Sequence, residues 1–177
     1  FYYTLRENEQ STVVTRIFED NTGLLWIGTR TGLFVYDRIT NSFSSYKNDE
    51  TNPFSLSHNS VCDIFQDKAG SVWIGTNAGG VNAYHKTSNK FGHFSRSENT
   101  PNTISSNKTY AFAEDGHQPV ADGAGNREDG NLWIGTYEGG ISALDRKTGK
   151  FTNFPRALNH THDNVLCLYI DSENLLW

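Results

Sequence analysis

The tetrapeptide Trp-Ile-Gly-Thr occurs three times in this sequence of 177 residues, and its spacing limits what the chain can fold into. The copies begin at Trp26, Trp73 and Trp133, and a truncated copy ends at Trp177. An aspartate stands six positions before Trp26, Trp73 and Trp177, whereas Asp115 stands eighteen positions before Trp133. The third unit therefore carries a twelve-residue insertion, and without it the units recur every 44–48 residues. This period is close to that of repeats that each contain four strands.

Each unit contains four short apolar segments separated by turn residues, which predicts four strands. In the second unit the predicted strands cover residues 60–65, 72–76, 81–84 and 91–94. A helical period is not sustained anywhere in the chain. Because a small sheet with two apolar faces must stack on neighbouring sheets, hairpins that recur at a fixed period predict an all-β fold, namely a β-propeller.

The repeated tryptophan and glycine have predicted structural roles within such a fan of sheets. The indole is large enough to fill the gap between adjacent twisted sheets, and the glycine two positions later lets a neighbouring backbone approach. The structural repeat residues are Trp26, Gly28, Trp73, Gly75, Trp133, Gly135 and Trp177.

The repeat divides the chain into units of a single partial β-propeller over residues 1–177. The units are residues 1–12 approximately, as the end of a preceding blade, then 13–46, 60–94, 108–154 with the insertion 116–128, and a truncated unit at 164–177. They supply about three to four blades of four antiparallel strands, fewer than a seven- or eight-bladed ring contains. We therefore expect an open arc of a larger propeller, and a chain that is a piece of a longer one.

Composition and charge exclude several functions. The 15 Lys and Arg residues are scattered singly against 20 Asp and Glu, which gives a net charge of −5 and argues against a nucleic-acid partner. The apolar runs are short, as at Leu24–Ile27, and have far fewer than the roughly 20 residues that cross a bilayer, so no membrane contact is expected. The two cysteines, Cys62 and Cys167, provide neither a disulfide framework nor a zinc motif.

Candidate ligand-binding residues lie in the connectors between units and in the turns between the second and third strands, which share one face of a propeller. The turns keep their glycine while the preceding residues differ between copies. The candidates are Arg30, Asn77, Tyr137 and Glu138 in the turns and His58, Asn59 and Lys108 in the connectors. Amide, hydroxyl and imidazole groups beside an aromatic ring suit a sugar. The alternative, that these are ordinary solvated loop residues, stays open.

The insertion 116–128 is expected on the opposite face, as an extension of the hairpin between the first and second strands. The insertion contains Asp122 and Glu128 and is followed by Asp129, but these acidic residues lack the spacing of a calcium-binding loop. We therefore expect no metal, no cofactor and no catalytic residue, and a contact between the insertion and a neighbouring domain stays open.

The repeat pattern resembles a known family. Residues Glu19–Thr29, with Asp20, Gly23 and Trp-Ile-Gly-Thr, and the connector Asn48–Val61 are similar to the two-component regulator propeller repeat. The resemblance implies the periplasmic sensor region of a Bacteroides-type hybrid histidine kinase that detects oligosaccharides and signals to an output module outside this chain. It also implies the remaining blades of the same parent chain and a homodimer of the full receptor as partners.

Other functions remain open at this stage. One is a propeller enzyme or lectin that acts on polysaccharide, of the lyase or quinone-dependent dehydrogenase type. It would need titratable residues near the propeller axis, where the predicted first strands offer Arg16 and Asp63. The others are a sensor region for another output, such as a diguanylate cyclase, and a scaffold that binds no ligand.

Overall fold

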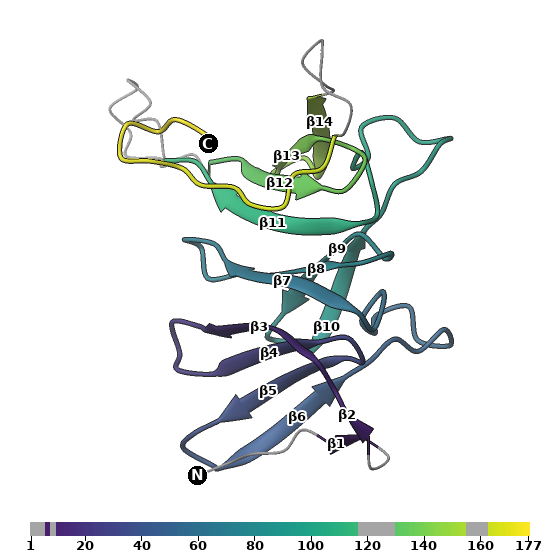
Figure 1. Cartoon of the computed structure of the whole chain (residues 1–177), viewed down its shortest axis with the longest axis vertical. Helices are drawn as coiled ribbons and strands as arrows, with labels where there is room; N and C mark the ends of the chain where they lie inside the picture. The colour runs from purple at the N-terminus through teal and green to yellow at the C-terminus, as the bar shows by residue number, and fades with distance from the viewer. Residues whose placement is uncertain (1–5, 8–9, 117–129, 155–162) are drawn as a thin grey trace.

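The computed structural model describes residues 6–7, 10–116, 130–154 and 163–177. Within them the chain forms three sheets of four antiparallel strands and a two-stranded hairpin, and no helix. The three sheets follow one another along the long axis of the molecule like the segments of a fan (Figure 1). The predicted all-β fold, an open arc of propeller blades, is confirmed.

The strands follow the repeat units closely. The hairpin of β1 (Arg6–Glu7) and β2 (Gln10–Ser11) precedes the blades and lies in the unit 1–12. The first blade contains β3 (Val14–Glu19), β4 (Leu25–Thr29), β5 (Leu33–Asp37) and β6 (Ser42–Tyr46). The second contains β7 (Val61–Gln66), β8 (Val72–Thr76), β9 (Val81–His85) and β10 (Lys90–Phe94). The third contains β11 (Thr109–Glu114), β12 (Leu132–Thr136), β13 (Ile141–Asp145) and β14 (Lys150–Phe154). In the second blade, the predicted strand ends agree with these bounds to within one residue.

Each blade is a meander in which consecutive strands pair. The first strands, β3, β7 and β11, pack against one another from blade to blade and form the inner side of the arc (Figure 1). The turns from the second to the third strand therefore lie at the same end of the blades as the starts of the inner strands, as the sequence predicts. Backbone bonds show this directly, because the amides of Arg30, Asn77 and Tyr137 donate to the carbonyls of Val13, Ser60 and Lys108, respectively.

The repeated tryptophans fill the interfaces between blades. Trp26 is 2% exposed and belongs to an apolar cluster with Ile64, Val72 and Phe91 of the second blade. Trp73 is 5% exposed and belongs to the corresponding cluster with residues of the third blade. The predicted wedge role is confirmed for these two residues.

The aspartate before each tryptophan explains the constant spacing of six. Its carboxylate accepts a hydrogen bond from the indole Nε1 in all four units, from Trp26 to Asp20 at 2.9 Å and from Trp133 to Asp115 at 3.0 Å. In Asp20, burial alone would raise the carboxyl pKa, but hydrogen bonds from Trp26, Thr22 and Leu24 lower it below its usual value. The bond is kept in the third unit, so Asp115 and Trp133 hold the base of the insertion together. The insertion 116–128 itself, except Gly116, lies outside the described residues.

The glycine two positions after each tryptophan lies where the inner strand of the next blade crosses. A Cβ atom on Gly28 would meet Val61 Cγ1 at 2.6 Å, one on Gly75 would meet the Thr109 carbonyl oxygen at 2.9 Å, and one on Gly135 would meet Val165 Cγ1 at 2.7 Å. The predicted close approach is confirmed at all three positions.

The substitution Gly28→Ala should lower the free energy of unfolding by about 1–3 kcal/mol, because the added methyl forces the first two blades apart. Urea unfolding followed by far-UV circular dichroism measures the change. Gly92→Ala is the matched control, since a Cβ there first meets the tip of the His85 side chain at 3.1 Å, and it should shift stability by less than about 0.5 kcal/mol. Equal stability of the Gly28 variant and the natural chain would contradict the close-packing argument.

The last described segment, residues 163–177, runs beside β11 (Figure 1). The amide of Val165 donates to the Thr136 carbonyl. The segment therefore lies beside the third blade as β7 lies beside the first. The segment then folds back, with backbone bonds between Tyr169 and Trp177 and a single bridge between Ile170 and Leu176. Trp177 is 71% exposed, although its indole still donates to Asp171.

None of the residues that the structure describes belongs to an apolar helix long enough to traverse a bilayer. Cys62 and Cys167 are both free thiols.

Candidate ligand-binding pocket

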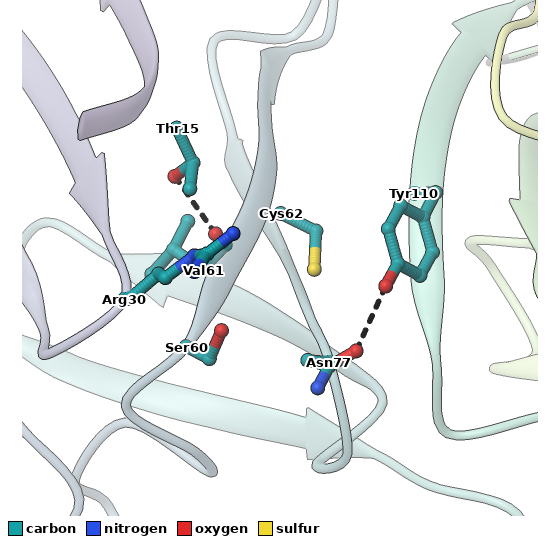
Figure 2. Close-up of a pocket in the computed structure, with 7 residues that line it drawn as sticks. All are labelled: Thr15, Arg30, Ser60, Val61, Cys62, Asn77 and Tyr110. Atoms are coloured by element: carbon teal, nitrogen blue, oxygen red, sulfur yellow. Dashed lines mark hydrogen bonds between the residues drawn. The ribbon is translucent and has the colours of Figure 1, made fainter. Parts of the chain in front are cut away.

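A pocket of about 490 Å³ opens at the inner side of the arc, where the first and second strands of neighbouring blades meet. Figure 2 shows its lining, which comes from all three blades. The lining residues are Thr15, Arg30, Ser60, Val61, Cys62, Asn77 and Tyr110. The volume is within the range of small-molecule binding sites.

Three lining residues occupy the same bulge in successive blades. The pairing of the first with the second strand shifts register between Val14 and Arg16, and at the corresponding places in the second and third blades. The extra residues are Thr15 in β3, Cys62 in β7 and Tyr110 in β11. A bulge residue departs from the regular alternation of side chains, which is why all three turn into the pocket instead of into the blade interfaces.

Two more lining residues, Arg30 and Asn77, begin the turns after β4 and β8. Each follows the threonine of Trp-Ile-Gly-Thr, whose side chain is fully buried and bonds back across the turn. The hydroxyl of Thr29 donates to the Gly32 carbonyl at 2.8 Å, and that of Thr76 donates to the Gly80 carbonyl at 3.0 Å. The motif thus fixes the backbone of the turn and leaves the next side chain free to vary.

Hydrogen bonds order the polar groups of the pocket. The Tyr110 hydroxyl donates to Asn77 Oδ1 at 2.8 Å, and the Thr15 hydroxyl donates to the Val61 carbonyl at 2.8 Å (Figure 2). Burial raises the pKa of the Cys62 thiol to about 11, so the thiol stays protonated at neutral pH. Burial, with a further contribution from Cys62, also raises the pKa of Tyr110. The pocket is therefore lined by neutral polar groups and one guanidinium.

The predicted residues Tyr137, Glu138 and Lys108 form a second cluster next to this pocket. The ring centroid of Tyr137 lies 6.1 Å from that of Tyr110. The Lys108 ammonium lies 5.1 Å from the Tyr137 centroid and 3.2 Å from Glu138 Oε2. The side chains of Lys108 and Glu138 are 43% and 66% exposed, so they extend the polar surface outward from Tyr110 along the same end of the blades.

The predicted residues His58 and Asn59 are engaged inside their connector. His58 Nδ1 accepts from the Ser60 amide at 3.1 Å, and Asn59 Oδ1 accepts from the Asn48 amide at 2.7 Å. Asn107 closes the next connector in the same way, by accepting from the Arg96 amide at 2.6 Å. The structure thus brings Arg30 and Asn77 into one pocket, places Tyr137, Glu138 and Lys108 beside it, and uses the two connector residues to hold the loop.

Sequence reasoning missed the remaining lining residues, Thr15, Ser60, Val61, Cys62 and Tyr110. Thr15, Cys62 and Tyr110 differ in chemistry, but so do the residues that follow them, Arg16, Asp63 and Ala111, so variation between copies does not single out the bulge positions. Strict alternation along a strand would have sent these side chains into the blade interfaces, and only the bulge redirects them.

The titratable pair predicted near the axis is an ion pair. Arg16 Nε lies 2.9 Å from Asp63 Oδ1, and the Asp63 side chain is 13% exposed. Burial raises the pKa of Asp63, and Arg16 counteracts this effect. In the described ranges, no three His, Cys, Asp or Glu side chains gather into a group that could hold a metal ion.

Two segments of the chain match a known protein family. Residues 8–31 and 55–78 match the family model of the two component regulator propeller. These two segments, 48 of the 177 residues, carry two component regulator propeller repeats. Both matched segments contain a Trp-Ile-Gly-Thr motif, and the segment 55–78 also includes four of the seven pocket residues, from Ser60 to Asn77.

Two of the solved structures that resemble this chain are extracellular domains of signalling systems. The chain superposes on the extracellular domain of a putative hybrid two component system of B. thetaiotaomicron with a TM-score of 0.75 and 25% identity, over 92% of this chain and 21% of that one. The extracellular domain of a putative one component system of the same organism gives 0.72 and 26%, over 94% and 22%. PorZ, a surface component of the type-IX secretion system of Porphyromonas gingivalis, shares the fold at 0.62 and 17% identity, over 99% and 25%.

The chain spans about a fifth to a quarter of the length of these solved structures. No curated protein matches its sequence significantly.

Proposed function

We propose that this chain is a ligand-sensing segment of the extracytoplasmic region of a bacterial two-component receptor, of the hybrid histidine kinase type. In this proposal the pocket binds an oligosaccharide, and a change in blade packing passes the signal to an output module elsewhere in the parent protein. A ligand can change the blade packing only if it binds two blade arrangements with different affinities. The likeness to extracellular domains of B. thetaiotaomicron signalling systems supports the receptor context.

The observation that carries the ligand-binding role is the pocket, in which a repeated frame presents different side chains. The turn threonines fix the backbone at Arg30 and Asn77, and the bulges aim Thr15, Cys62 and Tyr110 at the same space. Hydroxyl and amide groups beside a tyrosine ring match the hydroxyls and C–H faces of a sugar.

The proposed role is non-catalytic. The thiolate, and not the thiol, is the nucleophilic form of cysteine, and the raised pKa of Cys62 keeps the thiol protonated. The remaining polar lining groups are hydroxyls, an amide and a guanidinium, which bind a ligand through hydrogen bonds, and the side chain of Val61 is apolar.

Further blades of the parent chain are the proposed neighbours of the first blade. Ile17 on β3 is 60% exposed, whereas Ile64 and Phe112, at the same place in β7 and β11, are 0% and 6% exposed because a preceding blade covers them. A preceding blade from the same parent chain would cover Ile17 in the same way.

Asn77→Ala should weaken oligosaccharide binding by the complete extracytoplasmic region about five- to ten-fold, because it removes hydrogen bonds worth about 1 kcal/mol in the pocket. A glycan array finds the ligand and calorimetry measures its affinity. Asn21→Ala, at the opposite end of the blades, is the control and should bind as the natural protein does. If no glycan binds while deletion of the propeller still silences signalling, the segment is a scaffold and the proposal is wrong.

A further inference from the structure

Arg30 differs from the other residues of the pocket in its charge. Among the lining residues it alone is charged at neutral pH, because Cys62 and Tyr110 are protonated and the rest are neutral. Its backbone is fixed by the bond of its amide to the Val13 carbonyl at 3.2 Å. Its guanidinium forms no ion pair or side-chain hydrogen bond with any residue in the described part of the chain.

Three other arginines in the described part of the chain are paired with carboxylates. Arg16 pairs with Asp63, Arg38 with Glu19, and Arg146 with both Asp67 and Glu114, at distances of 2.7–3.0 Å. Arg30 is exposed, as Arg16 and Arg38 are, but unlike them it has no carboxylate partner among the described residues.

The other charged side chains on the elements around Arg30 form ion pairs with one another. On the adjoining inner strands, Asp63 is bound by Arg16 at 2.9 Å. In the outer cluster beside Tyr110, Lys108 is bound by Glu138 at 3.2 Å. The pocket thus presents a local positive charge in a chain whose net charge is −5.

We propose that Arg30 binds an oxyanion on the sugar ligand, either the carboxylate of a uronic acid or a sulfate ester. This inference rests on the proposed function and names the class of its ligand. A guanidinium presents a planar fork of N–H donors that matches two oxygens of such a group. Around it in the pocket lie the Asn77 Nδ2 amide group, which has no hydrogen-bond partner among the described residues, and the hydroxyls of Ser60 and Thr15 (Figure 2). These groups would bind the sugar hydroxyls.

Calorimetry with the complete extracytoplasmic region tests this inference with two matched pairs of probes. One pair is oligogalacturonate and its carboxyl-reduced galactose counterpart, and the other is a sulfated galactan oligosaccharide and the same sugar after desulfation. At least one acidic probe should bind with an affinity at least about ten-fold higher than that of its neutral partner. The pair that shows the difference identifies the oxyanion. The preference should weaken as salt is raised.

The variants separate the role of Arg30 from general electrostatics. Arg30→Gln should abolish the preference, so that the acidic probe and its neutral partner bind alike, while Arg30→Lys should keep part of the preference. Arg38→Gln, which removes one positive charge at the opposite end of the blades, should leave the preference for the acidic probe as it is in the natural protein. Neutral probes that bind as tightly as their acidic partners in both pairs, or a preference that survives in the Arg30→Gln protein, overturn this inference and leave the proposed function standing. Absence of binding to these probes and to a broad glycan array overturns both.

Discussion

Replacing Arg146 with methionine should lower the free energy of unfolding by about 3–5 kcal/mol, the range observed when one partner of a buried ion pair is removed. Arg146 follows β13 in the third blade and reaches back into the interface with the second. Its guanidinium lies 2.8 Å from Asp67 Oδ2 and 2.7 Å from Glu114 Oε1, and it also donates to the Gly130 carbonyl at 2.7 Å. Methionine fills a similar volume but leaves both carboxylates without a counter-charge.

Burial explains why the expected effect is large. The side chains of Arg146, Asp67 and Glu114 are 10%, 1% and 3% exposed, so water cannot replace the lost guanidinium. Urea unfolding measures the change, and the double variant Arg146→Met/Glu114→Gln should recover part of the loss, because one uncompensated carboxylate fewer remains.

The first blade offers a matched control for this prediction. Arg38 occupies the same place after β5 and pairs with Glu19 at 3.0 Å, but the two side chains are 54% and 48% exposed. Arg38→Met should therefore cost less than about 1 kcal/mol. If the two variants unfold at the same urea concentration, the inter-blade ion pair is not a major source of stability.

The fold could be predicted because its determinants repeat along the sequence. Trp26 and Trp73 recur at a fixed distance from an aspartate, and that distance is fixed by a hairpin whose ends are joined by the indole–carboxylate bond. Gly28 recurs because the next inner strand passes too close for a side chain. Features that every blade needs are visible as a pattern in one sequence.

Features that belong to a single interface could not be predicted in this way. The positions of Arg146 and Glu114 in the third unit are taken by Lys86 and Gln66 in the second, where Gln66 bonds instead to Asn21 and Gly70. The ion pair between Arg146 and Asp67 is thus formed at this place in one interface among the described residues. Asp67 is 79 residues from Arg146, and only the stacking of the blades brings these two together, whereas Glu114, 32 residues from Arg146, belongs to the same blade.

The candidate site was predictable where turn chemistry decides it. Arg30 and Asn77 could be assigned to the pocket because a glycine turn follows a fixed motif and shows which end of the sheet they occupy. Tyr110 could not, because a β-bulge reverses the direction that alternation predicts, and a bulge is fixed by the pairing of two strands. His58, in turn, was selected for its chemistry, although its ring nitrogen accepts a bond within its own connector.

Trp26→Ala should also destabilise the chain by about 3–5 kcal/mol, since it removes a large aromatic side chain from a closed interface. The indole packs edge-on against Tyr84 of the second blade, with ring centroids 5.0 Å apart and an interplanar angle of 72°. The substitution opens a cavity between the blades and also deprives the Asp20 carboxylate of the Trp26 Nε1 donor at 2.9 Å.

Trp177 separates these contributions, because it keeps the bond to an aspartate without the interface. Its Nε1 donates to Asp171 Oδ2 at 2.7 Å, yet the residue is 71% exposed. Trp177→Ala should therefore change the free energy of unfolding by less than about 0.5 kcal/mol in the same far-UV circular dichroism experiment. If both tryptophan variants are destabilised equally, the indole–aspartate bond and not the wedge between blades stabilises the arc. If only Trp26→Ala is destabilised, the stacking of blades on the indole ring holds the fan together.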